Sequence, residues 1–252
     1  MSQIEKAAHF AEMHQQDNPV VLYNIWDSGG AKALVEVGAP AVATGSWSIA
    51  AAHGFDDGEA MPLHLVLAIV ARICDTVEVP VTIDFEGGFA SDPGSVAENV
   101  RRVLRAGAIG INFEDRIVQG EGLYAIRAQA DRIAAIRSMA EAEGVPLFIN
   151  ARTDLFLESD AATHGGHLSE AIDRGDAYRK AGADCLFVPG LTDPQLISDV
   201  VARAKMPVNV MMMGDLQSIE DATALGVSRI SFGPGPFLKA QADLRARYQQ
   251  LK

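Results

Sequence analysis

The stretch Val79-Pro-Val-Thr-Ile-Asp-Phe-Glu-Gly-Gly88 holds the pattern around which the rest of the chain is arranged. Residues 81–83 are all β-branched, which predicts a short buried strand, and the carboxylates of Asp84 and Glu86 follow it. Side chains two residues apart on a strand point the same way, so we expect Asp84 and Glu86 to aim at one point beyond the strand end. The two glycines then permit a sharp turn.

Two later stretches repeat this arrangement of an apolar strand that ends in polar residues. They are Gly110-Ile-Asn-Phe-Glu-Asp115 and Phe148-Ile-Asn-Ala-Arg-Thr-Asp154. The ends of these three successive strands thus carry acids, an acid pair and an arginine. This pattern predicts a metal and an anionic substrate that bind at one shared site.

The remaining apolar runs predict the other strands of a larger sheet. The expected strands are Val20–Ile25, Ala41–Thr44, Val81–Ile83, Ile109–Phe113, Leu147–Asn150, Cys185–Val188, Val208–Met212 and Arg229–Phe232. Between them lie stretches with helical spacing, and several of these end at a glycine that precedes the next strand: Gly38, Gly107, Gly144, Gly182 and Gly226.

This alternation predicts the fold class. Strands that are apolar on both faces are typical of parallel sheets covered by helices. Eight of them in 252 residues indicate an α/β protein with a (β/α)₈ TIM barrel. The structural alternative is an open doubly wound sheet, but no Gly-x-Gly-x-x-Gly follows the first strand. No linker divides the chain, so residues 1–252 are expected to form one domain.

Composition excludes several classes of function. The formal net charge of −12 argues against binding to nucleic acid or to anionic membranes. The two cysteines, Cys74 and Cys185, lie in apolar runs, and reduced thiols of this kind favour a cytoplasmic location. Residues 1–19 do not resemble a signal peptide, and no apolar run is long enough to span a bilayer.

Active sites of (β/α)₈ barrels gather at the carboxyl ends of the strands. The polar candidates at these ends are Gly45-Ser-Trp47, Asp84, Glu86, Glu114, Asp115, Arg152, Asp154 and Asn209. Four ionised acids at the same end of the barrel repel each other unless a divalent cation binds between them. An all-oxygen set suits Mg²⁺, with Mn²⁺ as the alternative, and Asp84 is expected to bind directly while Glu86 and Glu114 act through water. The competing interpretation is that these acids cap the helices that follow.

The remaining candidates concern the substrate. Arg152 can grip a carboxylate with two parallel hydrogen bonds, or it can form a structural pair with a nearby acid. Residues 45–47 can offer backbone N–H groups to substrate oxygens, although Trp47 can equally be a core residue. Two segments, 116–124 and 159–168, are polar and contain glycine, which predicts loops. His164 and His167 therefore do not suggest a metal site, and Met211–Met213 is expected in the barrel interior.

Seven motifs in order resemble those of the isocitrate lyase / phosphoenolpyruvate mutase superfamily. They are Asn24-Ile-Trp-Asp27, Gly45-Ser-Trp47, Gly54-Phe-Asp-Asp-Gly-Glu59, Asp84-Phe-Glu-Gly-Gly-Phe89, Gly110-Ile-Asn-Phe-Glu-Asp115, Asn150-Ala-Arg-Thr-Asp154 and Phe187-Val-Pro-Gly190. The resemblance covers residues 18–240 and implies a (β/α)₈ barrel, Mg²⁺, and a 2-oxo or 2-hydroxy acid substrate whose C–C or P–C bond is cleaved or formed next to an enolate.

The resemblance also implies roles for individual residues. Asp84 corresponds to the direct metal ligand, and Glu86 and Glu114 to ligands through water. Arg152 corresponds to the group that grips the substrate carboxylate, and Gly45, Ser46 and Trp47 to the loop that holds the carboxylate and oxo group. Asp57 corresponds to the acid near the reacting bond, and Asn209 is a further substrate-binding candidate.

The chain departs from the superfamily pattern in two loops and at its end. Isocitrate and methylisocitrate lyases carry a Lys-Lys-Cys-Gly-His-type motif in the loop that corresponds to residues 116–124, where this chain has no Cys, Lys or His. The mutase-type Lys-x-Asn-Ser segment is absent too. The tail after Phe232 is short for a family whose members often exchange a C-terminal helix, and a homodimer or homotetramer is an expectation from the family alone.

These observations favour a Mg²⁺-dependent enzyme that breaks a C–C bond of a small anionic 2-oxo or 2-hydroxy acid through an enolate. Loop 116–124 would then close over the site and exclude water. Two alternatives stay open at this point. One is P–C bond chemistry on a phosphonopyruvate-like substrate, and the other is a barrel that binds a 2-oxo dicarboxylate without turning it over.

Overall fold

The computed structural model describes residues 1–251, which contain eight parallel strands in one sheet. The strands are β1 (Val20–Leu22), β2 (Val42–Ala43), β3 (Val81–Asp84), β4 (Gly110–Glu114), β5 (Phe148–Arg152), β6 (Cys185–Phe187), β7 (Val208–Met211) and β8 (Arg229–Ser231). Each overlaps one of the eight predicted strands. They are short and buried on both faces, as expected for a sheet enclosed by helices.

The sheet closes on itself. Its order is β1-β8-β7-β6-β5-β4-β3-β2, and every ladder between neighbours is parallel. Strands β1 and β2 then meet just beyond their ends through a parallel bridge between Ile25 and Thr44. The Ile25 N–H donates to the Ala43 carbonyl (2.9 Å), and the Gly45 N–H donates to the Ile25 carbonyl (3.1 Å). The predicted (β/α)₈ barrel is therefore confirmed.

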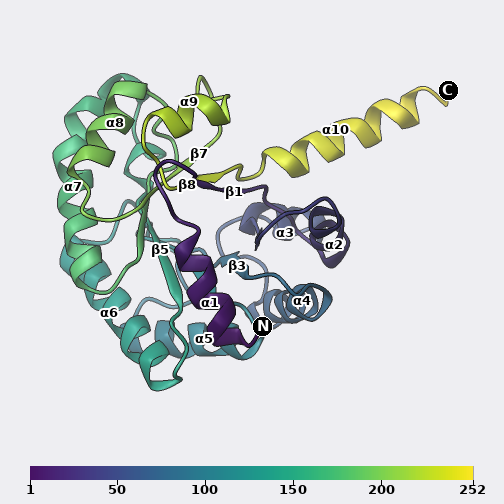
Figure 1. The fold of residues 1–252 in the computed structure, drawn as a ribbon, viewed down its shortest axis with the longest axis horizontal. Coiled ribbons are helices and arrows are strands. Elements are labelled where there is room, and N and C mark those ends of the chain that lie inside the picture. Colours follow the sequence, from purple (N-terminus) through teal and green to yellow (C-terminus); the bar gives the residue numbers. More distant parts are fainter. Residues whose placement is uncertain (252) are drawn as a thin grey trace.

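Helices alternate with the strands and surround the barrel (Figure 1). Within residues 1–251 they are α1 (Gln3–Glu12), α2 (Ser28–Glu36), α3 (Ser46–Ala52), α4 (Leu63–Thr76), α5 (Pro93–Arg105), α6 (Ile126–Ala142), α7 (His164–Lys180), α8 (Pro194–Arg203), α9 (Ile219–Ala224) and α10 (Gly235–Gln249). Side chains of Asp27, Asp92 and Asp193 cap three of them by accepting a backbone N–H from the first turn. All five predicted terminating glycines have positive φ.

Helix α1 closes the amino-terminal end of the barrel, here called the floor. Its Phe10 is fully buried and packs edge-on against Phe148 of β5 at 5.1 Å between ring centres. His14, just after the helix, stacks on the same Phe148 ring at 4.1 Å. The carboxyl ends of the strands, here called the mouth, are left for the loops that follow each strand.

One predicted loop is wrong in part. Residues 159–168 were expected to be irregular, but a 3₁₀ turn (Ala161–Thr163) leads directly into α7, which begins at His164. His164 is buried and packs edge-on against Phe156 at 5.1 Å, so tertiary contact overrides the weak helix propensity of Gly165 and Gly166. The other predicted loop, 116–124, is confirmed as irregular apart from an isolated bridge between Arg116 and Leu123.

The C-terminal segment after Phe232 folds mostly into one helix. Helix α10 extends away from the barrel (Figure 1), and only its Pro236 and Phe237 are buried. Phe237 packs against the rings of Trp26 and Trp47 and so anchors the start of the helix beside the mouth. None of the helices in residues 1–251 combines the length and apolarity needed to cross a membrane.

Candidate functional site at the barrel mouth

The turn that follows β3 has an uncommon backbone. Glu86 and Phe89 have positive φ values of 49° and 56°, and Glu59 on the neighbouring loop has a φ of 60°. Residues other than glycine rarely adopt this conformation, and it persists where the surroundings hold it in place. Because β3 ends at Asp84, strand alternation does not set the direction of Glu86. The conformation of the turn sets the direction of the Glu86 side chain instead. Asp84 and Glu86 are therefore close for a different reason than the strand alternation expected from the sequence.

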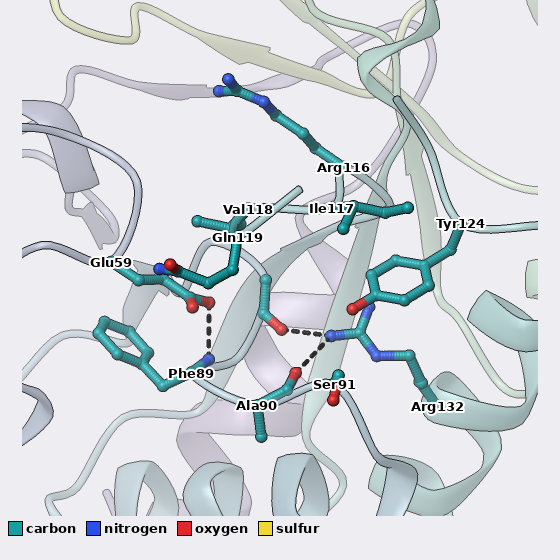
Figure 2. Close-up of a pocket in the computed structure, with 11 residues that line it drawn as sticks. Glu59, Phe89, Ala90, Ser91, Arg116, Ile117, Val118, Gln119, Tyr124 and Arg132 are labelled. Carbon is teal, nitrogen blue, oxygen red and sulfur yellow. Dashed lines mark hydrogen bonds between the residues drawn. The ribbon is translucent and has the colours of Figure 1, made fainter. Parts of the chain in front are cut away.

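Neighbouring groups hold the turn from both sides. The Glu59 N–H donates to Oε2 of Glu86 (2.5 Å), and Oε1 of Glu59 accepts the Phe89 N–H (2.7 Å). On the other side, the buried guanidinium of Arg132 donates to the carbonyl oxygens of Gly87 and Ala90, as Figure 2 shows. The Glu86 carboxylate is therefore held by the Glu59 loop, while Arg132 on α6 fixes the backbone of the turn.

Loop 116–124 packs onto this turn. A Cβ placed on Gly87 would lie 2.8 Å from Cγ2 of Val118, so the close approach of the loop requires glycine there. The loop, the turn and Arg132 enclose a cavity of about 490 Å³ (Figure 2). Arg116 points away from the turn in that view, and its Nε lies 3.3 Å from Oε1 of Glu158. None of the predicted catalytic, substrate-binding or metal residues lines this cavity.

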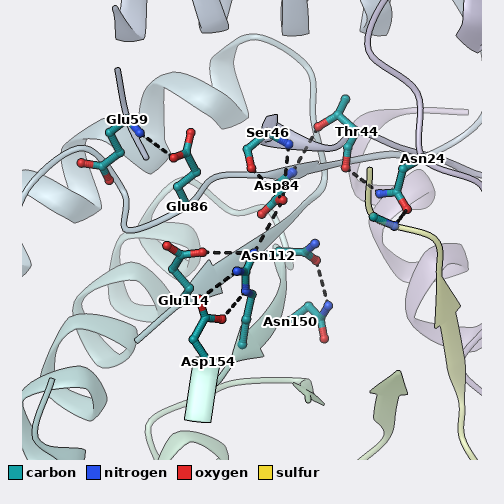
Figure 3. Close-up of polar contacts among 12 residues, drawn as sticks. Asn24, Thr44, Ser46, Glu59, Asp84, Glu86, Asn112, Glu114, Asn150 and Asp154 are labelled. Carbon is teal, nitrogen blue, oxygen red and sulfur yellow. Dashed lines mark hydrogen bonds and ion pairs between the residues drawn. The ribbon is translucent and has the colours of Figure 1, made fainter. Parts of the chain in front are cut away.

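Asp84 lies at the centre of the predicted site (Figure 3). Its Oδ2 accepts the Ser46 hydroxyl at 3.0 Å and the Ser46 N–H at 3.4 Å. Its backbone N–H donates to the Thr44 hydroxyl at 3.1 Å. Its Oδ1 is buried and has no hydrogen-bond partner. A buried carboxylate oxygen without a partner is costly, so this atom is suited to a cation.

Three other acids near Asp84 are destabilised as anions. Burial, followed by repulsion from Asp84 and Asp57, raises the pKa of Glu86 to about 8. Burial also raises the pKa of Glu114 well above its usual range, against the opposing effect of Arg152. The pKa of Asp57 is raised by burial and then by the charge of Asp84. A bound divalent cation would offset all three effects.

Arg152 is the last residue of β5, and it faces these acids. Its Nη1 lies 3.1 Å from Oε2 of Glu114 and 3.9 Å from Oδ2 of Asp84. Its Nη2 donates to Oδ2 of Asp154 at 2.8 Å, and its Nε bonds the other oxygen of the same carboxylate. Asp154 is itself held by Asp115, which accepts its backbone N–H at 3.0 Å. Arg152 thus takes part in structural pairs and also lines the cavity described next.

A cavity of about 300 Å³ opens beside Asp84 at the mouth. Six of the predicted residues line it: Gly45, Ser46, Trp47, Asp57, Asp84 and Arg152. Glu86 and Glu114 are not among the lining residues of this cavity, although both interact electrostatically with Asp84. Asn209 does not line it either. Its side chain is fully buried within the barrel, and its Oδ1 accepts the Ser231 hydroxyl at 3.2 Å.

Asn112 also lines this cavity, although it was not among the predicted site residues. Its Oδ1 accepts hydrogen bonds from Nδ2 of Asn150 (2.8 Å) and from Nη2 of Arg229 (3.0 Å). The amide oxygen is therefore occupied on the barrel side, and the NH₂ group is left as a donor for the cavity. A signal for this residue was present, because Asn112 lies two residues before Glu114 on the same strand.

The donor set suits Mg²⁺. No three side chains of His, Cys, Asp or Glu in residues 1–251 form a closed metal-binding group. Mg²⁺ does not need one, because it keeps several waters and takes one or two carboxylates directly. The unpartnered Oδ1 of Asp84 fits a direct contact to such an ion, and the carboxyl groups of Glu86 and Glu114 lie close enough to Asp84 to interact with it electrostatically.

Comparison with known proteins places the chain in a family. The family model for phosphoenolpyruvate phosphomutase matches residues 10–252. A provisionally assigned phosphonomutase from Burkholderia cenocepacia J2315 is 42% identical, with a TM-score of 0.97 over all of both chains. The 2-methylisocitrate lyase of Escherichia coli K12 is 28% identical over 77% of this chain and 65% of its own length.

A phosphonopyruvate hydrolase solved with oxalate and Mg²⁺ shares the fold. It is 21% identical, with a TM-score of 0.86 over 100% of this chain and 87% of that protein. The resemblance found in the sequence is therefore confirmed, and the chain belongs to the phosphoenolpyruvate phosphomutase family.

Proposed function

We propose that this protein is a Mg²⁺-dependent lyase that breaks a C–C bond of a small anionic 2-oxo or 2-hydroxy acid. The observation that carries the proposal is the buried, unpartnered Oδ1 of Asp84 beside a cavity that Arg152 also lines. A cation and a guanidinium on one small cavity suit a substrate with a carboxylate next to an oxo or hydroxyl group. The named lyase among the relatives supports the same reaction class.

Asp84 would hold the ion directly, and Glu86 and Glu114 would hold its waters. When bound, Mg²⁺ polarises the oxo or hydroxyl oxygen of the substrate. The chain itself orients these ligands: Ser46 fixes one oxygen of Asp84, and the Glu59 N–H fixes the Glu86 carboxylate. The ligands are thus preorganised by hydrogen bonds that do not depend on the ion.

Three groups would bind the substrate oxygens. Asp154 holds the guanidinium of Arg152 in one plane, and the substrate carboxylate would share this guanidinium with Glu114, which lies 3.1 Å from Nη1. The NH₂ group of Asn112 is directed to the same cavity. The third donor is the backbone N–H of Trp47, which lies in the first turn of α3 and so has no acceptor within the helix.

Asp57 is the candidate for proton transfer. It lines the cavity, and burial and the charge of Asp84 raise its pKa, which brings it closer to the range in which a carboxyl group can both take and return a proton. In cleavage of a 2-hydroxy acid it would remove the hydroxyl proton as that carbon becomes a carbonyl. The electron pair of the broken C–C bond would pass into the leaving fragment as an enolate, which would then take the proton back from Asp57. Glu114 is placed to balance charge through Arg152 rather than to reach the substrate.

P–C bond chemistry is the second candidate, because the provisionally assigned phosphonomutase is 42% identical over the whole chain. A phosphonate group carries up to two negative charges. Among residues 1–251, however, Arg152 is the one cation that lines the cavity at Asp84. Apart from a bound Mg²⁺, a phosphonate would therefore have Arg152 as its single cationic partner in this cavity.

The test is release of pyruvate or CO₂ from a panel of acids, measured with Mg²⁺ and with excess chelator. The panel contains oxaloacetate, 2-alkylmalates, methylisocitrate and phosphonopyruvate. We expect chelator-sensitive release from a carbon acid. Release from phosphonopyruvate alone would favour the P–C reaction, and tight binding of a 2-oxo acid without turnover would favour a binding protein.

We also propose that the protein assembles as a homo-oligomer. Helix α10 projects from the barrel with Leu238 and Leu244 exposed by 50% and 62%, and exposed apolar side chains that gather on one element mark an interaction surface. A second copy of the chain would cover them. Light scattering should give a mass above that of one 26.8 kDa chain, and a monomer at micromolar concentration would contradict the proposal.

A further inference from the structure

The cavity at Asp84 has two walls of different chemistry. Strands β2 to β5 and their loops supply the polar wall with Ser46, Asp57, Asp84, Asn112 and Arg152. The opposite wall comes from the ends of β5 to β8, and we call it the apolar wall. It consists of Leu157, Phe187, Pro189, Met211, Met213 and Pro234.

The apolar wall supplies neither a positive charge nor a free hydrogen-bond donor for a second anionic group. Arg152 is already shared among Glu114, Asp84 and Asp154 on the polar wall. Two polar residues lie next to the apolar wall, and both have partners. Ser231 donates its hydroxyl to Oδ1 of Asn209 (3.2 Å), and Asn24 accepts the Phe232 and Gly233 N–H groups (2.9 Å each) and donates to the Thr44 carbonyl. A carboxylate placed against the apolar wall would therefore lose its water without gaining a partner.

The rim of the same cavity exposes large apolar side chains. Trp47, Leu157 and Met213 line it and are 36%, 39% and 38% exposed. The cavity is small, about 300 Å³, which is at the lower end of the range for ligand sites. The reacting end of a ligand is fixed on the polar wall, so the other end must lie against these side chains.

We propose that the substrate is a 2-oxo or 2-hydroxy acid whose non-reacting end is an uncharged alkyl group, seated between Leu157, Met211 and Met213. The inference rests on the proposed function for the position of the reacting end. It excludes substrates that carry a further carboxylate at that end. Each methylene buried against the wall should tighten binding about fourfold until the wall is covered.

The experiment is calorimetric binding to the full-length protein with saturating Mg²⁺. The probes are pyruvate, 2-oxobutyrate, 2-oxopentanoate and 2-oxoglutarate. The last two have five carbons each and differ in whether the chain ends in a methyl or a carboxylate group. We expect affinity to rise along the first three acids and 2-oxopentanoate to bind at least ~10-fold tighter than 2-oxoglutarate.

A charge introduced into the apolar wall should reverse this preference. Met213 is partly exposed, so Met213→Arg is expected to fold, and it would supply a partner for the terminal carboxylate. We expect the ratio of the two affinities to shift toward 2-oxoglutarate by at least ~10-fold. Val37→Arg adds the same charge at a residue that is 82% exposed and does not line the cavity, and it should leave the ratio unchanged.

The outcomes separate this inference from the proposed reaction. Equal affinity for 2-oxopentanoate and 2-oxoglutarate in the wild type, or an unchanged ratio in Met213→Arg, would overturn the inference even if the protein is a lyase. A clear alkyl preference without any C–C cleavage would support the inference and count against the reaction. If none of the four acids binds, both proposals fail.

Discussion

The mouth and the floor of the barrel bury charges of opposite sign. At the mouth, burial raises the pKa of Glu86 to about 8 and that of Glu114 well above its usual range. At the floor, burial lowers the pKa of His14 to about 3, with a further contribution from the nearby Arg229, whose own pKa is lowered by burial to about 10. Both ends therefore disfavour their charged forms.

The two ends relieve this cost differently. His14 is 6% exposed, donates from Nδ1 to the Phe10 carbonyl (2.8 Å) and stacks on Phe148. Its Nε2 is buried without a hydrogen-bond partner, so the ring limits the cost of burial by staying neutral. The acids at the mouth face a cavity, and Oδ1 of Asp84 has no partner. An unpartnered nitrogen on a neutral ring costs much less than an unpartnered carboxylate oxygen, so the floor stays stable without a ligand, whereas the acids at the mouth are stabilised by a cation. The difference indicates that the mouth is built for binding and the floor for stability.

The largest effect is expected from Asp84→Asn, which keeps the shape of the side chain and removes its charge. Turnover of the best carbon acid should fall at least ~10³-fold, because the direct ligand for Mg²⁺ is lost. The measurement is kcat/KM at saturating Mg²⁺. Asp17→Asn, an exposed acid near the floor, is the matched control and should keep full activity. Activity in Asp84→Asn within tenfold of the wild type would break the assignment of function to the mouth.

Arg152→Lys tests whether the mouth needs a planar guanidinium rather than a positive charge. Lysine cannot form the paired bonds to Asp154 and present a second edge to the substrate. We expect kcat/KM to fall about 10²-fold, mostly through a higher KM, since the lost contact binds substrate and transition state alike. A lysine variant with unchanged KM would show that Arg152 serves only its structural pairs.

His14→Phe tests the floor through the pH dependence of stability. The folded pKa of His14 lies below the unfolded value of 6.5, so the unfolded chain binds more protons at acidic pH. The wild type therefore loses stability as the pH falls from 6.5 toward 3, by up to ~1.4 kcal/mol per pH unit. Urea unfolding at pH 6.5 and 5.0 should show that the wild type loses roughly 2 kcal/mol more than the variant. Equal losses would show that His14 does not stay neutral.

Arg229→Met is expected to have the smallest effect on binding. It tests whether a residue of the floor supports the cavity at the mouth. Arg229 donates to Oδ1 of Asn112 from below, while its Nε and Nη1 have no partners in the buried interior. Removing a poorly satisfied buried charge should leave the midpoint of thermal unfolding nearly unchanged. Affinity for oxalate with Mg²⁺ should fall about tenfold, because the Asn112 amide loses one of its two restraints. A large loss of stability with unchanged affinity would assign Arg229 to the floor alone.

Much of the mouth could be predicted from the sequence, because its polar residues stand at the ends of apolar strands. Asp84, Glu114 and Arg152 follow this rule, and barrel strand ends always meet at one face. Glu86 was placed at the site for the wrong reason, since its direction depends on a positive φ that hydrogen bonds from the Glu59 loop hold in place.

The features that were not predicted depend on how the strands are staggered and on contacts between residues distant in sequence. Asn112 pairs with Asp84 and Asn150 across neighbouring strands, whereas Asn209 pairs with Phe187 and Arg229, and no local pattern reveals this register. Met211–Met213 was expected in the barrel interior, but Met211 and Met213 line the cavity. His14 lies beyond the end of α1, where nothing local indicates that it stacks on β5.

The most direct test of the account is calorimetric titration of the wild-type protein with oxalate, a stable analogue of the enolate of pyruvate. If Asp84 holds Mg²⁺, oxalate should bind with Mg²⁺ present, excess chelator should abolish binding, and Asp84→Asn should not bind oxalate in either condition. Binding of equal strength with and without chelator would contradict the account, because the anion would then be held without a cation at Asp84.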